Sequence, residues 1–286
     1  MLKTKLYLDS QNFIHRARSG FTEGENSIVY NFFRNFRALV NSFSPVSEIY
    51  FVLEGKPVEK EIILETYKQN RKIDVSNLDD PKIKEALEKK IDFFRQVDII
   101  HKILVDAFPV KICRHAEFEC DDTLYNLIRL NSKHGDNHIV ISNDTDFIQL
   151  LNEFENVSIY NPMKKVYVEK PRYDYAMWKS LTGDKSDNIP GIPGIGTKRA
   201  EQLMLNLDKL REFFEKDTNN FALFQKNYSL IKFKEWNDEE FNSLKILECK
   251  LDESCIKTSF NDLGFESITS EKSWEKFINT FKQLDN

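Results

Sequence analysis

The strongest constraint on the fold is a regular alternation of short apolar segments with longer segments of helical periodicity. Four short segments rich in aliphatic and aromatic residues have the character of buried strands: Lys5–Leu8, Glu48–Leu53, Val110–Cys113 and His138–Ser142. Between them lie three segments with apolar residues three and four positions apart, which we expect to be helices: Ser27–Phe43, Ile91–Phe108 and Glu119–Leu130. Strands that alternate with helices usually form a parallel sheet. We therefore predict an α/β fold with a mainly parallel central sheet flanked by helices.

The second half of the chain has a different pattern. Val157–Tyr160 and Lys165–Val168 are predicted to form a small antiparallel edge, and strand signals fade from Tyr173 onward. The remainder is predicted to be mostly helical, with a short strand around Leu251–Cys255. We therefore expect an α/β core over residues 1–182 and a helical subdomain over residues 183–286.

Size and charge exclude several classes of protein. The 286 residues can bury a core without disulfide staples, and the four cysteines form no CxxC pair, which disfavours structural zinc. The formal net charge of −5 argues at first against a nucleic-acid partner, because such proteins usually carry a basic excess. Neither a signal peptide nor a run of 18 apolar residues is evident, so we expect a cytoplasmic protein without a membrane span.

Acidic residues follow the ends of three predicted strands: Asp9, Glu54, and the pair Asp144 and Asp146. The carboxyl ends of parallel strands meet at one edge of a sheet, where functional residues gather. Five further acids precede a predicted helix or a glycine-rich turn: Glu119, Asp121, Asp122, Asp184 and Asp187. Taken singly, each of these acids also fits a helix cap or a solvated turn.

As a set, the nine carboxylates indicate a metal site. Carboxylates gathered without histidine or cysteine favour hard cations, so we expect Mg²⁺ or Mn²⁺. Two ions about 3.5–4 Å apart would stabilise both the attacking and the leaving oxygen of an in-line phosphoryl displacement. No serine, cysteine or histidine stands in a triad-like arrangement. The pattern therefore favours metal-assisted phosphoryl transfer over covalent catalysis.

The segment Tyr67–Lys72 offers one aromatic ring and three cations. Lys68 and Arg71 share a face if the segment is helical, and Tyr67 is a candidate for stacking on an unpaired base. Beside an acidic metal cluster, this segment is a natural source of positive charge aimed at a scissile phosphate. A solvated helix end is the ordinary alternative.

The turn Gly191–Gly196, with the sequence GIPGIG, is similar to the hairpin of helix-hairpin-helix modules. Glycines at 191, 194 and 196 permit a tight turn that presents backbone N–H groups at the start of the following helix. Lys198 and Arg199 lie in the first turn of that helix. We expect Gly191, Gly194, Gly196 and these two cations to bind duplex phosphates without reading sequence, although an ordinary connection between helices has similar punctuation.

Five motifs occur in a definite order: YLDSQNFIHRA at Tyr7–Ala17, YKQNR at Tyr67–Arg71, ECDD at Glu119–Asp122, SNDTDFIQLL at Ser142–Leu151 and GDKSDNIPGIPGIGTKRA at Gly183–Ala200. In this order they resemble the motifs of the flap endonuclease / 5′→3′ exonuclease family. The similarity is greatest to stand-alone bacteriophage-type enzymes and to the 5′ nuclease domain of bacterial DNA polymerase I. It covers Leu6 to about Leu207, and the last motif is long and specific.

The resemblance implies a PIN/5′-nuclease-like core, a helical arch over about residues 56–95 and a helix-three-turn-helix subdomain. It implies two metal clusters, the first served directly or through water by Asp9, Glu119, Asp121, Asp144 and Asp146. The second cluster would be served by Asp122, Asp184 and Asp187 with help from Asp146. Lys68 and Arg71 would contact the scissile phosphate, with Lys72 nearby, and the hairpin would also bind K⁺.

Two departures from the family pattern concern charged residues. Glu54 stands where the family has aspartate; its side chain is one methylene longer and could still hold a metal-bound water. Lys60 stands where the family has arginine, and lysine keeps the charge while losing the bidentate fork.

The sequence thus predicts a monomeric, metal-dependent, structure-specific 5′ nuclease. Its expected substrates are DNA with a 5′ flap or a 5′ end and RNA–DNA hybrids, and replication proteins are expected partners. A catalytically silent DNA-binding relative, a PIN-type ribonuclease and a small-molecule phosphatase are the alternatives. The nearly complete acid set disfavours the silent relative, and the hairpin at Gly191–Gly196 disfavours the other two.

Overall fold

The structure, a computed structural model, describes residues 3–21, 24–71, 80–132 and 135–284. At its centre is a seven-stranded sheet with the order β6-β5-β4-β1-β2-β3-β7. The strands are β1 (Thr4–Asp9), β2 (Glu48–Val52), β3 (Lys111–Arg114), β4 (Asn137–Ile141), β5 (Val157–Asn161), β6 (Val166–Tyr167) and β7 (Lys245–Glu248). Strands β1 to β5 run parallel, whereas β6 and β7 pair antiparallel at the two edges. The predicted α/β fold with a mainly parallel sheet is confirmed.

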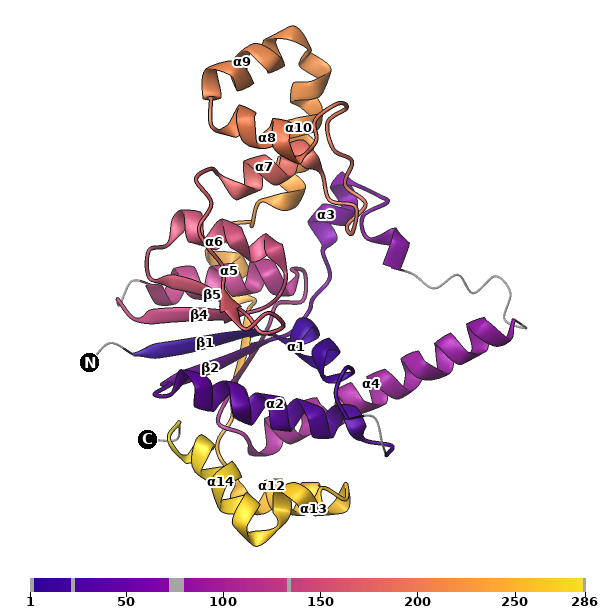
Figure 1. Ribbon diagram of the computed structural model, residues 1–286, viewed down its shortest axis with the longest axis vertical. Helices are drawn as coiled ribbons and strands as arrows, with labels where there is room; N and C mark the ends of the chain where they lie inside the picture. The colour runs from indigo at the N-terminus through magenta and orange to yellow at the C-terminus, as the bar shows by residue number, and fades with distance from the viewer. Residues whose placement is uncertain (1–2, 22–23, 72–79, 133–134, 285–286) are drawn as a thin grey trace.

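Helices cover both faces of the sheet (Figure 1). The helices nearest to it are α1 (Ser10–Ala17), α2 (Ser27–Phe43), α4 (Pro81–Ala107), α5 (Cys120–Asn131) and α6 (Ile148–Glu153). Side chains alternate along β1, so Leu6 and Leu8 pack among residues of α1, α2 and α4, whereas Tyr7 packs among residues of α5 and α6. The sheet is therefore buried on both sides, as parallel sheets generally are.

The pairing register brings several strand ends to one edge. Asp9, the last residue of β1, lies beside Val52, the last residue of β2. On its other side, Leu8 lies beside Ile141, the last residue of β4. The segments that follow β1, β2 and β4 therefore leave the sheet next to one another, and each begins with the acids predicted from the sequence.

The predicted arch region contains α3 (Val58–Ile63), the short 3₁₀ helix η1 (Gln69–Arg71) and the first part of α4. Helix α4 begins ten residues before the predicted start at Ile91, because Asp80 caps it and Pro81 occupies its first turn. Phe93 is the first buried residue of α4, and the apolar residues Ile83 and Leu87 before it are only partly buried, so the start of the helix has a thin apolar stripe and projects from the core (Figure 1). Lys72 lies outside the described residues. Across the described ranges, no helix has both the length and the apolar character needed to span a membrane.

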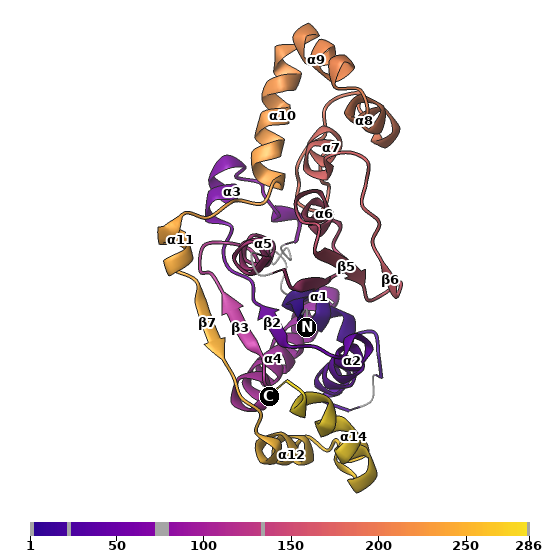
Figure 2. The same ribbon diagram turned by 90° about the vertical axis from the view of Figure 1, so that its left-hand side faces the viewer.

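A group of helices projects from the sheet and holds its own apolar cluster (Figure 1). It consists of α7 (Tyr175–Thr182), α8 (Thr197–Met204), α9 (Leu207–Lys216) and α10 (Thr218–Ile231). Helix α10 then leads the chain back to the sheet (Figure 2). There Gln149 donates to the carbonyl oxygen of Ile231 and accepts from the backbone N–H of Phe233, at 3.2 and 3.0 Å.

The C-terminal residues return to the α/β core instead of continuing the helical group. They form α11 (Asp238–Asn242), β7, α12 (Glu253–Asp262), α13 (Glu266–Thr269) and α14 (Glu271–Lys282). Strand β7 pairs with β3, while Leu251–Cys255, where the sequence suggests a strand, leads into α12. All four residues of β7 are exposed, so this strand lacks the apolar alternation that marks a half-buried strand. The expectation of one helical subdomain over residues 183–286 thus differs from the observed packing.

A substitution of Phe260 tests whether the C-terminal helices share the core of the sheet. The ring of Phe260 is fully buried on α12 and packs against Phe33 of α2. Phe260→Ala is expected to lower the free energy of unfolding by about 3–5 kcal/mol, measured by urea denaturation. Phe221→Ala on α10 is the matched control, because its ring is 42% exposed and its loss should cost about 1 kcal/mol or less. Equal effects of the two substitutions would contradict a shared core.

Candidate metal centre

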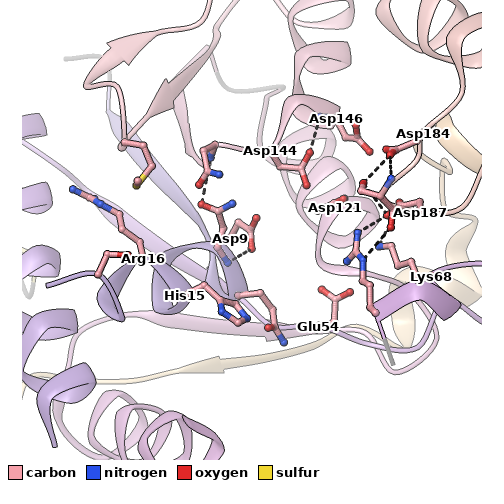
Figure 3. A pocket seen from close by; sticks show the side chains of 17 residues that line it. Asp9, His15, Arg16, Glu54, Lys68, Asp121, Asp144, Asp146, Asp184 and Asp187 are labelled. Carbon is pink, nitrogen blue, oxygen red and sulfur yellow. Dashed lines mark hydrogen bonds and ion pairs between the residues drawn. The ribbon is translucent and has the colours of Figure 1, made fainter. Parts of the chain in front are cut away.

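An open cleft of about 560 Å³ lies at the edge of the sheet where β1, β2 and β4 end. Seven of the nine predicted carboxylates line it: Asp9, Glu54, Asp121, Asp144, Asp146, Asp184 and Asp187. Figure 3 shows these side chains converging from the strand ends, the start of α5 and the segment after α7. Lys68 and Arg71 line the same cleft. The fold therefore gathers most of the acids, and two of the cations, that the sequence singles out.

Asp9 occupies the centre of the edge and is held rigidly. One of its carboxylate oxygens accepts from the backbone N–H of Asn12, at 3.0 Å, which caps α1. The other accepts from the hydroxyl of Ser142 at 3.1 Å. Asp144 caps the next turn in the same way and accepts from the N–H of Asp146 at 2.9 Å. Local capping thus aims these acids before any ligand is bound.

A second group of acids lies beside the first. One carboxylate oxygen from each of Asp146, Asp184 and Asp187 lies within 4.8 Å of the others. Asp184 and Asp187 lie on a loop that begins with a turn at Gly183. The φ of Gly183 is +74°, and a Cβ atom there would lie 2.3 Å from the backbone nitrogen of Gly191. Only glycine fits this close approach, because any side chain would collide with backbone. The glycines of the last sequence motif therefore position the acids as well as the hairpin.

Electrostatics show how strongly these acids repel one another. Burial raises the pKa of Asp9 to about 6, and the nearby charge of Asp144 adds to the increase. Burial raises the pKa of Asp146 to about 6 in the same way, with Asp144 again contributing. Burial and Glu119 together raise the pKa of Glu54 to about 7. A cluster of carboxylates whose pKa values are raised in this way fits a divalent metal ion, whose charge would offset the cost of ionising them.

The structure places Glu119 and Asp122 away from the lining of this cleft. Lys60 lies between them, with its Nζ 2.8 Å from Glu119 Oε2 and 2.9 Å from Asp122 Oδ2. The other oxygen of Asp122 accepts from the backbone N–H of Lys234 at 2.9 Å. Although burial opposes it, the charges of Lys60 and Lys68 lower the pKa of Glu119 to about 2. Both oxygens of Asp122 are engaged by the protein, which does not match its expected place in the second metal cluster.

Tyr67 also differs from its expected use. Its ring is only 5% exposed, and its hydroxyl lies 2.9 Å from Glu119 Oε2 and 3.1 Å from Asp187 Oδ2. A buried ring cannot stack on an unpaired base, so the structure replaces the predicted stacking by a bridge between two acids. Lys68, next in the chain, contacts the same two acids. Arg71 contacts Asp187 while its side chain stays 54% exposed.

Sequence reasoning missed Lys179 on α7. This lysine is only 8% exposed; its Nζ lies 2.6 Å from Asp184 Oδ2 and also contacts Asp146. Burial lowers the pKa of Lys179, but the two acids outweigh it and raise the pKa overall. A lysine five residues before Asp184 is a weak signal, because only the packing of α7 against the turn after β4 shows that it reaches Asp146 and Asp184.

The hairpin lies apart from the cleft, on the projecting helices. Gly194 has a φ of +74°, and Gly196 precedes the first residue of α8. Lys198 and Arg199 are exposed in the first turn of α8, and Arg199 donates to the carbonyl oxygen of Gly194 at 3.3 Å. The turn therefore presents cations and a helix N-terminus to solvent, as phosphate contact requires.

Comparison with known proteins agrees with this geometry. Residues 4–179 match the family model described as 5′-3′ exonuclease, N-terminal resolvase-like domain, and residues 171–271 match its C-terminal SAM fold. A 5′-3′ exonuclease of Buchnera aphidicola is 25% identical over 98% of this chain and 92% of its own length. A DNA polymerase I of Caldicellulosiruptor bescii is 27% identical over 66% of this chain and 24% of its own length. The chain belongs to the 5′-3′ exonuclease family.

A solved structure extends the similarity to the whole fold. The flap endonuclease of bacteriophage T5, crystallised as a pseudo-enzyme–product complex with DNA and metal ions, superposes with a TM-score of 0.65 at 16% identity. The superposition covers 99% of this chain and all of the bacteriophage chain. The chain is thus a nuclease of this family, with the fold of a flap endonuclease.

The raised pKa values predict an unusual dependence of stability on pH. Between about pH 4 and 7 the folded, metal-free protein keeps protons on Asp9, Glu54 and Asp146 that the unfolded chain has released. The free energy of unfolding contributed by these groups therefore falls as pH rises through that window. We expect Asp146→Asn to flatten this decline in EDTA, and Mg²⁺ to raise Tm more at pH 8 than at pH 5.5. A steeper decline in the variant would contradict this assignment.

The buried contacts of Lys179 predict a stability loss that depends on metal. Lys179→Met should lower the free energy of unfolding in EDTA by about 3 kcal/mol, because two carboxylates lose their cation. Added Mg²⁺ should shrink the loss, since it supplies positive charge to the same acids. Lys102→Met is the control, because Lys102 pairs with Asp106 on the exposed surface and should change stability by about 0.5 kcal/mol at most. A loss that Mg²⁺ leaves unchanged would show that Lys179 acts by packing alone.

Proposed function

We propose that this protein is a divalent-metal-dependent, structure-specific 5′ nuclease that hydrolyses phosphodiester bonds in DNA with a 5′ flap or a 5′ end. The observation that carries the proposal is one cleft in which acids from five separate segments face Lys68 and Arg71. The DNA and metal ions in the bacteriophage T5 structure support the same substrate and cofactor class for this chain. RNA–DNA hybrids belong to the same proposal, as does action by a monomer.

Two groups of oxygen donors would hold the metal ions, which we take to be Mg²⁺ or Mn²⁺. Asp9, Asp121 and Asp144 would serve one site, with Glu54 reaching it directly or through water. Asp146, Asp184 and Asp187 would serve the other, and their mutual proximity supports this division. When bound, such ions activate water and stabilise the charge of the attacking and leaving oxygens.

The protein's own cations orient the phosphate. Lys68 Nζ lies at the cleft with its side chain one-fifth exposed, and its cation is backed by buried Glu119. Arg71 pairs with Asp187 while half of its side chain stays exposed, and its planar fork suits two oxygens of one phosphate. Both cations are therefore proposed to contact the scissile phosphate, where they would offset charge that develops during cleavage.

The projecting helices are proposed to hold the duplex. The exposed turn at Gly191, Gly194 and Gly196, with Lys198 and Arg199 beside it, offers backbone N–H groups and charge to phosphates without reading bases. Its carbonyl groups are also the donors that a K⁺ ion would use. Duplex binding and cleavage would thus take place on separate parts of the chain, which α7 and α10 join.

Cleavage of a labelled 5′-flap duplex tests this function. We expect product with Mg²⁺ and none with EDTA, and Asp144→Asn should reduce cleavage to background while leaving DNA binding intact. Lys68→Ala should lower kcat by about 10²-fold with a smaller change in KM, because its charge acts on the developing phosphate charge. Lys276→Ala, an exposed lysine on α14, is the control and should behave as wild type.

The same assay separates the alternatives. Absence of any metal-dependent product from the wild-type protein would leave a silent DNA-binding relative as the better account. Cleavage of single-stranded RNA in preference to the flap would favour a PIN-type ribonuclease. Equal losses of binding and cleavage in Lys68→Ala would contradict the role of that lysine in the chemical step.

A further inference from the structure

A smaller cavity adjoins the cleft between α1 and α4. Its walls are mainly apolar and come from Ile14 of α1 and from Phe93, Phe94 and Val97 of α4. Gln11 and Glu54 line both this cavity and the cleft, so the smaller cavity opens beside the acids. We call it the α1–α4 chamber. Because its wall is mainly apolar, the chamber does not suit metal binding.

The wall of the chamber is held in place by ring contacts. The ring of His15 stacks on Phe93, with ring centres 4.6 Å apart and planes inclined by 23°. The guanidinium of Arg18 lies 5.1 Å from the centre of the same ring. Phe94 meets Phe93 edge to face at 5.6 Å. Phe93 is therefore held by contacts on several sides, and its edge-to-face contact with Phe94 positions the Phe94 ring.

Phe94 is the exception in this wall, because 47% of it is exposed while Phe93 is 6% exposed. Phe94 lines the chamber, so the exposed part of its ring offers an apolar face to a ligand at that place. Exposed aromatic rings in single-strand binding sites stack on bases, and every base offers a π face. The position of Phe94 beside the cleft suits this use better than that of buried Tyr67.

Charge decides which part of a nucleic-acid strand can enter. Glu54 stands at the opening, and the lining also includes Ser10 and His101, whose pKa is lowered by burial. A phosphate there would therefore face a carboxylate and neither a lysine nor an arginine. Lys68 and Arg71, which suit phosphates, line the cleft and do not line the chamber. The backbone of a bound strand would therefore stay over the cations while a base turns toward Phe94.

Size limits how far the base enters. The chamber measures about 50 Å³, more than the roughly 30 Å³ share of one water but too little for a whole nucleotide. A base would consequently cover the exposed ring of Phe94 and insert only its edge. The amide of Gln11 at the mouth can both donate and accept a hydrogen bond with that edge.

We propose that the α1–α4 chamber binds one unpaired nucleobase of the cleaved strand, with Phe94 as the stacking face and Gln11 as its hydrogen-bonding partner. This inference rests on the proposed function, because the cleft must hold the strand. Phe94 is a positioning residue: it fixes the nucleotide beside the scissile phosphate and takes no part in the chemistry.

Fluorescence of 2-aminopurine tests the chamber without requiring cleavage. The base analogue is placed at single positions of a 5′ flap on both sides of the junction, and binding is followed with Ca²⁺ in place of Mg²⁺. We expect quenching at one position for the wild-type protein, its loss in Phe94→Ala and its recovery in Phe94→Trp. Ile91→Ala is the matched control, since Ile91 is 69% exposed one turn earlier on α4 and lies outside the chamber.

Kinetics with a modified substrate provide the second measurement. An abasic nucleotide at the quenched position should raise KM for the wild-type protein about tenfold, and Phe94→Ala should raise KM for the intact flap by a similar factor. The two changes together should add little, because both remove the same stack. Equal loss in Ile91→Ala, quenching that survives in Phe94→Ala, or additive losses would overturn the proposal. Absent cleavage with intact quenching would instead overturn only the proposed nuclease activity.

Discussion

Repulsion between carboxylates at one edge of the sheet is the constraint on which the rest of this structure depends. Parallel strands deliver Asp9 and the acids after β2 and β4 to the same place, and burial makes their charges costly. Positive charge must lie among them for the fold to persist at neutral pH. The chain meets this need with lysines from outside the sheet: Lys179 contacts Asp146 and Asp184, Lys68 contacts Glu119 and Asp187, and Lys60 contacts Glu119 and Asp122.

This constraint links the separate parts of the molecule. Lys60 of α3 pairs with Glu119 and Asp122, and Lys179 of α7 pairs with Asp146 and Asp184, so the arch region and the projecting helices are each tied to acids beside the sheet. It also explains the net charge of −5, which at first argues against a nucleic-acid partner. The negative charge is concentrated in the cleft, whereas exposed cations such as Lys198 lie where duplex phosphates are proposed to bind.

Much of the architecture was accessible from periodicity alone. The helix predicted over Ser27–Phe43 has those bounds in the structure, because its apolar stripe faces the sheet along its whole length. Periodicity placed the start of α4 ten residues too late, within a region where the resemblance implies a helical arch, because the first turns of that helix are largely exposed. It missed β7 because all four residues of that strand are exposed. The seven acids of the cleft could be found because strand ends, the start of a predicted helix and a glycine-rich motif mark them. The roles of Tyr67 and Asp122 could not, since a side chain's partner is set by distant segments.

The amino-acid sequence by itself determined the parallel α/β sheet, the order of the motifs and the set of acids at the edge of the sheet. These follow from local spacing, which fixes the type of each element and the residue at its end. Only the tertiary structure decided that Lys179 neutralises Asp146 and Asp184, that Tyr67 is buried, and that Phe94 stands half exposed beside the cleft. Those outcomes depend on contacts between segments far apart in the chain, and no local pattern encodes which side chains such packing brings together.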